Sequence, residues 1–224
     1  MKKTKFYNEE LTQTRVTNNI LRVYQKASIL DLSRDWYKEA NDFAVMTAID
    51  FDWKVSPEQV CGIVAALSPM CQWKRNKDLT IQFLTNYFAG QWNKTRCLGM
   101  SKQKAYQIAS LPNTERDNAG LIESILSGSK ISAFFDNILN YDSSERVTID
   151  RHALSILLGF KLTQEHFQNH KMTKNHYQFF SSCYVKAAQK AKISPLKMQA
   201  ITWELLRADH KAALANSNNL LNLK

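Results

Sequence analysis

Residues 128–159 read GSKISAFFDNILNYDSSERVTIDRHALSILLG. A glycine turn leads Lys130 into a segment of helical apolar spacing, and a polar loop then reaches the short run Val147-Thr148-Ile149 and Asp150. Asp150 follows Lys130 by 20 residues, and each lies at the start of a predicted helix. Unpaired backbone N–H groups and the helix dipole hold polar groups against ligands at such positions. The stretch therefore predicts a site built from two helix N-termini.

Composition favours a globular, helical protein with a polyanionic partner. The 224 residues suffice for one domain or two intimate lobes, and 44% of them are hydrophobic, with few glycines and four prolines. The net charge of +10 favours nucleic acid, because neutralising phosphates releases counterions. A solvated basic surface on a protein that binds no polymer is the alternative.

The chain shows no signal for a membrane, for secretion or for a metal. No apolar run approaches the length of a membrane span, and the start MKKTKFYNEEL lacks the apolar region of a signal peptide, so we expect a cytoplasmic protein. The four cysteines are widely spread, which argues against a zinc site or a disulfide framework. We expect no metal and no cofactor.

Helical periodicity and capping residues predict an all-α fold without a convincing strand pair. Ser56-Pro57-Glu58-Gln59 is a strong helix start, and the helix that follows is apolar nearly all round, so it should be buried until Ser68-Pro69 ends it. Ser33 is expected to cap an earlier helix. Further helices are predicted over about 16–26, 79–88, from 101, 119–126, from 129, 151–158, 177–190, from 195 and 212–223.

Two segments resemble the helix-hairpin-helix GPD superfamily of DNA glycosylases, which is endonuclease III-like. Leu126-Ser127-Gly128-Ser129-Lys130 is similar to the family hairpin L-P-G-V-G-x-K, shortened here, and Ile149-Asp150-Arg151-His152 is similar to its V-D-x-H. Gly62 to Asn76 resembles the early family segment in which a buried helix ends in L-S-x-Q. The resemblance covers about 55–159, and the compact, Lys- and Asn-rich chain suggests a divergent phage- or prophage-encoded member, acting in the host cytoplasm.

The resemblance implies a two-lobed helix-hairpin-helix fold. Residues 55–159 would form a central helical lobe with the degenerate hairpin and the catalytic aspartate, and 1–54 plus 160–224 a terminal helical lobe. Some members bind an iron–sulfur cluster through four closely spaced C-terminal cysteines. Since only Cys183 lies beyond residue 97 here, we expect no cluster.

The expected chemistry is cleavage of an N-glycosidic bond in DNA. Asp150 would stabilise the oxocarbenium-like sugar and orient or deprotonate the nucleophile. An unprotonated Lys130 would attack C1′ and add a lyase step, whereas a solvated Lys130 would leave water as the nucleophile. The resemblance and the local sequence suggest base or substrate contacts from Ser68, Gln72, Trp73, Asn76, Asn137 and His152, and DNA contacts from Gly128, Ser129, Arg151, Lys102 and Lys104.

Structural alternatives stand beside several of these assignments. Asp150 is also a preferred N-cap residue, Trp73 also fits the start of a core helix, and Lys102 and Lys104 also fit solvated positions in a first helical turn.

Three functions therefore stay open at the level of sequence. The first is a DNA glycosylase that flips out a damaged, mispaired or modified base. The second is a phage enzyme on the same fold that transfers an amino acid or polyamine to an activated hydroxymethyl pyrimidine in DNA, with Asp150 as the base for the amine. The third is a DNA-binding module without catalysis. In each case we expect a monomer that binds DNA and no membrane.

Overall fold

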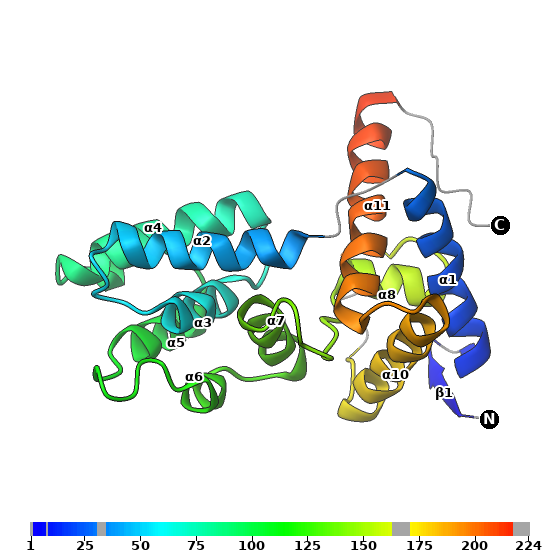
Figure 1. Cartoon of the computed structure of the whole chain (residues 1–224), viewed down its shortest axis with the longest axis horizontal. Helices are drawn as coiled ribbons and strands as arrows, with labels where there is room; N and C mark the ends of the chain where they lie inside the picture. The colour runs from blue at the N-terminus through cyan, green and yellow to red at the C-terminus, as the bar shows by residue number, and fades with distance from the viewer. Residues whose placement is uncertain (1, 8, 31–34, 163–170, 217–224) are drawn as a thin grey trace. The chain divides into compact units, whose positions relative to one another are not determined.

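The computed structural model describes residues 2–7, 9–30, 35–162 and 171–216. The chain forms two compact units, here called the terminal unit (Met1–Trp36 with Ser143–Lys224) and the central unit (Tyr37–Asp142). Both are built mainly from helices, labelled in Figure 1, so the all-α prediction is confirmed at the level of fold class. No helix in the described ranges is long and apolar enough to cross a membrane.

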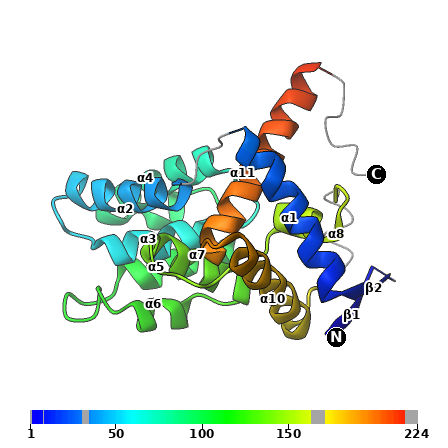
Figure 2. The same cartoon turned by 45° about the vertical axis from the view of Figure 1, so that its right-hand side comes forward.

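The terminal unit contains one exception to the all-α prediction. β1 (Lys3–Phe6) and β2 (Glu9–Thr12) pair antiparallel, with Lys3 opposite Thr12 and Phe6 opposite Glu9. Figure 2 shows the two strands side by side where α1 begins. The expectation that no strands pair is wrong here, because Phe6 and Leu11 are buried in the core of the unit while Lys3 and Lys5 are exposed.

Four helices complete the described part of the terminal unit. They are α1 (Gln13–Ile29), α8 (Arg151–Leu158), α10 (Lys174–Ala191) and α11 (Pro195–Asn216). α1 packs against the other three, and α11 also packs against α8 and α10. Apolar residues from all four helices, the hairpin and the segment before α8 share one hydrophobic core. Because Val147 and Ile149 belong to this core, it holds the segment that leads into α8.

The central unit surrounds α3. Its elements are α2 (Trp36–Asp50), α3 (Pro57–Leu67), α4 (Trp73–Phe88), the short 3-10 helix η1 (Trp92–Lys94), α5 (Gly99–Ala109), α6 (Ala119–Ile125) and α7 (Ser129–Leu139). α3 packs against α4, α5, α6 and α7 and is buried from Gln59 to Leu67, as predicted. Ser56 and Gln59 form the predicted capping box at its start.

Both unit boundaries differ from the predicted ones. Residues 37–54 belong to the central unit because α2 contacts it through side chains: Asn41 Nδ2 donates to the Ile138 carbonyl oxygen of α7 at 3.1 Å, and Phe43 lies against Trp73 of α4. Residues 143–159 belong to the terminal unit because α8 buries its apolar side against α1 and α11. As a result, Lys130 belongs to the central unit and Asp150 to the terminal unit.

Several helix limits also differ from the predictions. α4 begins at Trp73, as the structural alternative for that residue predicts, so it extends beyond the predicted 79–88. α10 begins at Lys174 and not at Tyr177, and α11 continues through the predicted break before Ala212. Thr173 and His176 explain the early start of α10, since they form a capping box. The predicted cap at Ser33 lies outside the described residues.

Candidate active site around Asp150

Asp150 is the N-cap residue of α8. Its Oδ1 accepts a hydrogen bond of 2.8 Å from the backbone N–H of Ala153. The carboxylate is half-buried, and among the contacts of the described residues its Oδ2 has no hydrogen-bond partner. One oxygen thus fixes the orientation of the group while the other stays available. The role of Asp150 as an N-cap and its expected role in catalysis are compatible, because the cap uses only one of the two carboxylate oxygens.

The segment that leads to Asp150 is held by Tyr177 of α10. Its Oη donates to the Val147 carbonyl oxygen at 2.7 Å and accepts from the Ile149 N–H at 3.2 Å. Burial raises the pKa of Tyr177 to about 12, and the nearby charge of Asp150 also raises it. The hydrogen bond from the Ile149 N–H and the charge of Arg146 lower this pKa, but their effect is smaller. The neutral phenol therefore bridges two backbone groups next to the candidate catalytic residue.

An aromatic cluster on α11 lies beside the start of α8. The His152 ring meets Trp203 edge to face with centroids 6.4 Å apart, and Trp203 meets Trp36 in the same way at 5.0 Å. The Arg207 guanidinium carbon lies 4.6 Å from the centroid of the Trp203 ring. The Trp203 Nε1–H is buried and has no acceptor within the described part of the chain. Through His152, this cluster connects the start of α8 to Trp203 and Arg207 of α11.

Trp203 and Arg207 are absent from the residues predicted from the sequence. A tryptophan and an arginine four residues apart on a predicted helix lie on one face, so the pair itself could have been predicted. The position of Trp203 beside His152 could not be predicted, because the two residues are separated by 51 positions.

Arg151 is half-buried at the first helical position of α8 and makes no ion pair with any described residue, so it is available for a phosphate.

The hairpin turn and Lys130 lie in the central unit, and the glycine turn leads into a helix as the sequence predicts. α6 and α7 are joined through Leu126–Gly128, and Gly128 has φ 90° and ψ 132°, which only glycine adopts without strain. The Ser129 and Lys130 backbone N–H groups at the start of α7 have no acceptor among the described residues. Lys130 is half-buried and Ser129 exposed. These positions suit an anion.

The two lysines assigned to DNA are bound to the protein itself. Lys102 Nζ donates to the carbonyl oxygens of Asn93 at 2.7 Å and of Thr95 at 3.1 Å. Lys104 Nζ donates to the Ser127 hydroxyl and so links α5 to the hairpin turn. Both ammonium groups shape loops, in contrast to the freely solvated lysines that position alone suggests.

Two residues assigned to base contact are buried and need correction. Asn76 is 2% exposed and donates through Nδ2 to the Val64 carbonyl oxygen of α3 at 3.1 Å. Asn137 is fully buried and donates to Tyr37 Oη at 3.3 Å. Both amides join helices inside the central unit, because a buried polar group needs an internal partner. Asn76 lies in α4 and not in a loop.

The remaining loop residues differ in their accessibility. Ser68 donates to the Ala65 carbonyl oxygen and ends α3, and Trp73 packs on Phe43 with Lys77 Nζ 5.6 Å from its ring centroid. Gln72 is exposed and makes no side-chain cap for α4. Met70, which the sequence did not single out, is 73% exposed at φ 60°. Gln72 is thus the predicted base contact of this loop that is open to solvent.

Apart from Lys102, which binds the η1 segment, and the buried Asn137, the predicted residues form three groups. Asp150, Arg151 and His152 lie together at the start of α8 in the terminal unit. Gly128, Ser129, Lys130 and Lys104 gather at the hairpin turn, and Ser68, Gln72, Trp73 and Asn76 follow the end of α3, both in the central unit. Within the described ranges, no group of three His, Cys, Asp or Glu side chains has the arrangement of a metal site.

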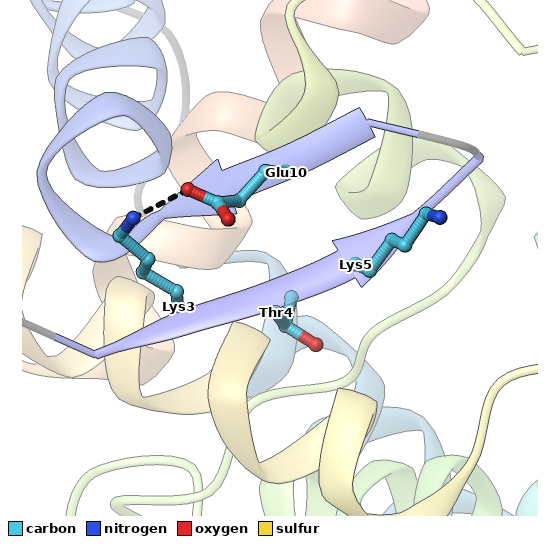
Figure 3. Close-up of a pocket in the computed structure, with 4 residues that line it drawn as sticks. All are labelled: Lys3, Thr4, Lys5 and Glu10. Atoms are coloured by element: carbon cyan, nitrogen blue, oxygen red, sulfur yellow. Dashed lines mark hydrogen bonds and ion pairs between the residues drawn. The ribbon is translucent and has the colours of Figure 1, made fainter.

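A shallow pocket of about 460 Å³ lies on the β-hairpin, and its lining includes none of the predicted site residues. It is lined by Lys3, Thr4, Lys5 and Glu10 (Figure 3). The Lys3 ammonium points across the strands to Glu10, with Nζ and Oε1 2.5 Å apart. One of the two lysines that line the pocket is therefore paired with the carboxylate that lines it. The pocket is open and mixed in charge, and we assign no ligand to it.

Comparison with known proteins gives one match. The sequence model of a family of unknown function (DUF7178) matches residues 2–210. No curated protein and no solved structure matches the chain.

Proposed function

We propose that this chain, which belongs to the family of unknown function DUF7178, is a DNA glycosylase that uses Asp150 to release a damaged or modified base. The observation that carries the proposal is the divided carboxylate of Asp150: Oδ1 accepts the Ala153 N–H, while Oδ2 has no hydrogen-bond partner among the described residues. A catalytic carboxylate needs a fixed orientation and one available oxygen, and this arrangement supplies both.

Cleavage of the N-glycosidic bond requires one carboxylate beside the sugar. As the bond between C1′ and the base nitrogen breaks, its electron pair leaves with the base and positive charge develops on the sugar. Asp150 stabilises that charge and accepts a proton from the water that bonds to C1′, and the departing base takes up a proton. Arg151, at the first position of α8, would hold a phosphate near this carboxylate.

Two features support DNA as the partner. The net charge of +10 favours a polyanion, and the hairpin turn presents the Ser129 and Lys130 N–H groups at a helix start, where phosphate oxygens bind well. Each contact of this kind adds affinity without reading sequence.

A lyase step through Lys130 is a separable part of the proposal. Its amine would displace the base and form a Schiff base at C1′, so the covalent adduct reports on Lys130 while base release reports on Asp150. The spacing of 20 residues between Lys130 and Asp150 in the sequence is the reason to test it.

The test uses oligonucleotides, duplex and single-stranded, that carry a panel of modified bases. Released bases are measured by mass spectrometry, and Schiff-base adducts are trapped with borohydride. Asp150→Asn is the informative variant, because asparagine caps helices as well as aspartate does and the fold should persist. Thr12→Ala, which removes the N-cap of α1, is the matched control: it loses a cap but should keep activity.

The outcomes separate the three functions. Base release abolished in Asp150→Asn but kept in Thr12→Ala supports a glycosylase, and an adduct lost in Lys130→Ala makes it bifunctional. Amine transfer to hydroxymethyl pyrimidine DNA without base release replaces the glycosylase by a base-modification enzyme. DNA binding with neither reaction leaves a binding module and overturns the proposal.

A further inference from the structure

We propose that the surface formed by the end of α4, η1 and α5 binds a single strand of nucleic acid. This surface, here called the acid-free face, is formed by the exposed and half-buried residues of the segment 79–114. The segment contains no aspartate or glutamate but contains Lys94, Arg96, Lys102 and Lys104. Since 20 of the 224 residues are acidic, a stretch of this length would hold about three on average. The charge of the segment is therefore uniformly positive.

The cations of the acid-free face are presented by a rigid loop. Lys102 donates to the Asn93 and Thr95 carbonyl oxygens, and Asn86 Nδ2 donates to Thr95 Oγ1 at 3.0 Å. These bonds fix the η1 segment between α4 and α5. Lys94 and Arg96 on the same segment are exposed and make no ion pair with any residue that the structure describes. Two unpaired cations on a fixed loop favour a phosphate backbone.

Aromatic rings run through the same surface. Trp92 stacks on Tyr106 with centroids 4.3 Å apart and planes at 28°, and Tyr106 meets Tyr87 edge to face at 5.9 Å. Tyr87 in turn meets Phe88, which is 41% exposed. Trp92 and Tyr106 are only half-buried, so the array reaches solvent. It fastens η1 and α4 to α5 and also offers ring surface beside the cations.

This combination distinguishes a single strand from other anionic partners. Base–aromatic stacking is worth about 1–3 kcal/mol per base and needs unpaired bases, whereas a duplex keeps its base faces covered. Exposed amides of Gln91, Asn93 and Gln103 add donors and acceptors suited to base edges. An acidic peptide would use Lys94 and Arg96 but would have no need of Trp92.

The acid-free face also lies next to the hairpin turn. Lys104 of α5 donates to the Ser127 hydroxyl, one residue before Gly128. A strand whose phosphate binds at Ser129 and Lys130 could therefore continue along α5 towards Arg96. The inference rests on the proposed function to the extent that DNA is the partner, and it adds a second contact surface for an unpaired strand.

The experiment measures the affinity of the full chain for a fluorescent thymidine oligonucleotide of roughly 12 nucleotides, within the usual range of single-strand sites. Lys94→Glu/Arg96→Glu should weaken binding at least tenfold and reduce the salt dependence, because each lost phosphate contact removes about 0.7 from the slope of log K against log salt. Trp92→Leu should weaken binding about tenfold through lost stacking. The matched control Lys190→Glu/Lys197→Glu makes the same charge change at exposed positions of the terminal unit and should change affinity less than threefold.

Equal losses in the variant and the control, or no loss in either, would overturn the acid-free face as a binding site. Displacement of the oligonucleotide by polyglutamate at equal charge, with no effect of Trp92→Leu, would replace the nucleic acid by an acidic peptide. The proposed function fails separately: if no substrate releases a base but Lys94→Glu/Arg96→Glu alone loses binding, the face stands and the glycosylase falls. Thermal unfolding verifies that each variant is folded.

Discussion

Tyr177 of α10 donates a hydrogen bond of 2.7 Å from its phenol to the carbonyl oxygen of Val147, 30 residues earlier in the chain. The same oxygen accepts the Ile149 N–H. One side chain thus satisfies two backbone groups of the segment that ends at Asp150, and the candidate catalytic residue depends on a neighbouring helix for its position.

Tyr177→Phe should destabilise the protein and slow base release. The substitution keeps the ring but leaves the Val147 oxygen and the Ile149 N–H without their partner, at a cost of about 2 kcal/mol in the free energy of unfolding. Urea unfolding measures the loss. Tyr24→Phe is the control, since the Tyr24 hydroxyl makes no hydrogen bond within the described structure and the change should be under about 0.5 kcal/mol. Equal stability of the two variants would contradict the bridging role.

Stability should fall at alkaline pH. Burial raises the pKa of Tyr177 from its ordinary value of 10.0 to about 12 and that of Cys183 from 9.0 to about 12. Between the ordinary and the raised pKa the unfolded chain has lost a proton that the folded chain keeps, so unfolding becomes more favourable as pH rises. Each group contributes about 1.4 kcal/mol per pH unit in its window. Unfolding free energies measured from pH 8 to 11 should show this decline, and Tyr177→Phe should decline less steeply above pH 10. An unchanged slope would contradict the assignment.

Gly62→Ala should destabilise the central unit although alanine favours helices. A Cβ on Gly62 would lie 2.5 Å from Cγ2 of Ile122 in α6, well inside van der Waals contact. Overpacking of this kind costs about 1–3 kcal/mol and outweighs the gain of roughly 1 kcal/mol in helix propensity. The double variant with Ile122→Ala should lose less than the sum of the single variants, because the clashing methyl group is gone. Additive losses in the unfolding free energies would show that α3 and α6 do not meet here.

Gly128→Ala should destabilise the hairpin turn through its backbone alone. No atom lies within 4 Å of the position a Cβ would take, but φ is 90° in a region that alanine avoids. We expect a loss of about 1–3 kcal/mol, together with weaker DNA binding. Gly120→Ala in α6, an exposed position with ordinary helical backbone, should not destabilise the protein and should gain about 0.5–1 kcal/mol from helix propensity. Similar unfolding free energies for the two variants would contradict a strained turn at Gly128.

The local features of the fold were predictable because they depend on neighbours in the chain. Ser56 and Gln59 cap each other across three residues, and Asp150 reaches the Ala153 N–H in the same way. The buried character of α3 followed from an apolar sequence on all sides. The limits of α4 and α10 were less predictable, since Trp73 and Lys174 start helices without an apolar pattern in their first turn.

The candidate site was predictable only in part. The helix starts at Asp150 in the terminal unit and at Gly128 in the central unit were predictable from the local sequence. Asn76 and Asn137 were assigned to ligand contact because amides often read bases, yet each is buried and joins two helices. Trp203 lies beside His152 through the packing of α11 on α8, which no spacing in the sequence reveals.

By itself, the sequence determined the helical class, the helix starts at Ser56, Gly128 and Asp150, and the positive charge, because capping, glycine turns and composition act within a few residues or over the whole chain. Tertiary structure decided which unit holds Asp150, which amides are buried, and that Phe6 and Leu11 anchor a β-hairpin. These outcomes depend on burial against residues far away in the chain, and such burial outweighs local preference because its free energy is set by the whole core.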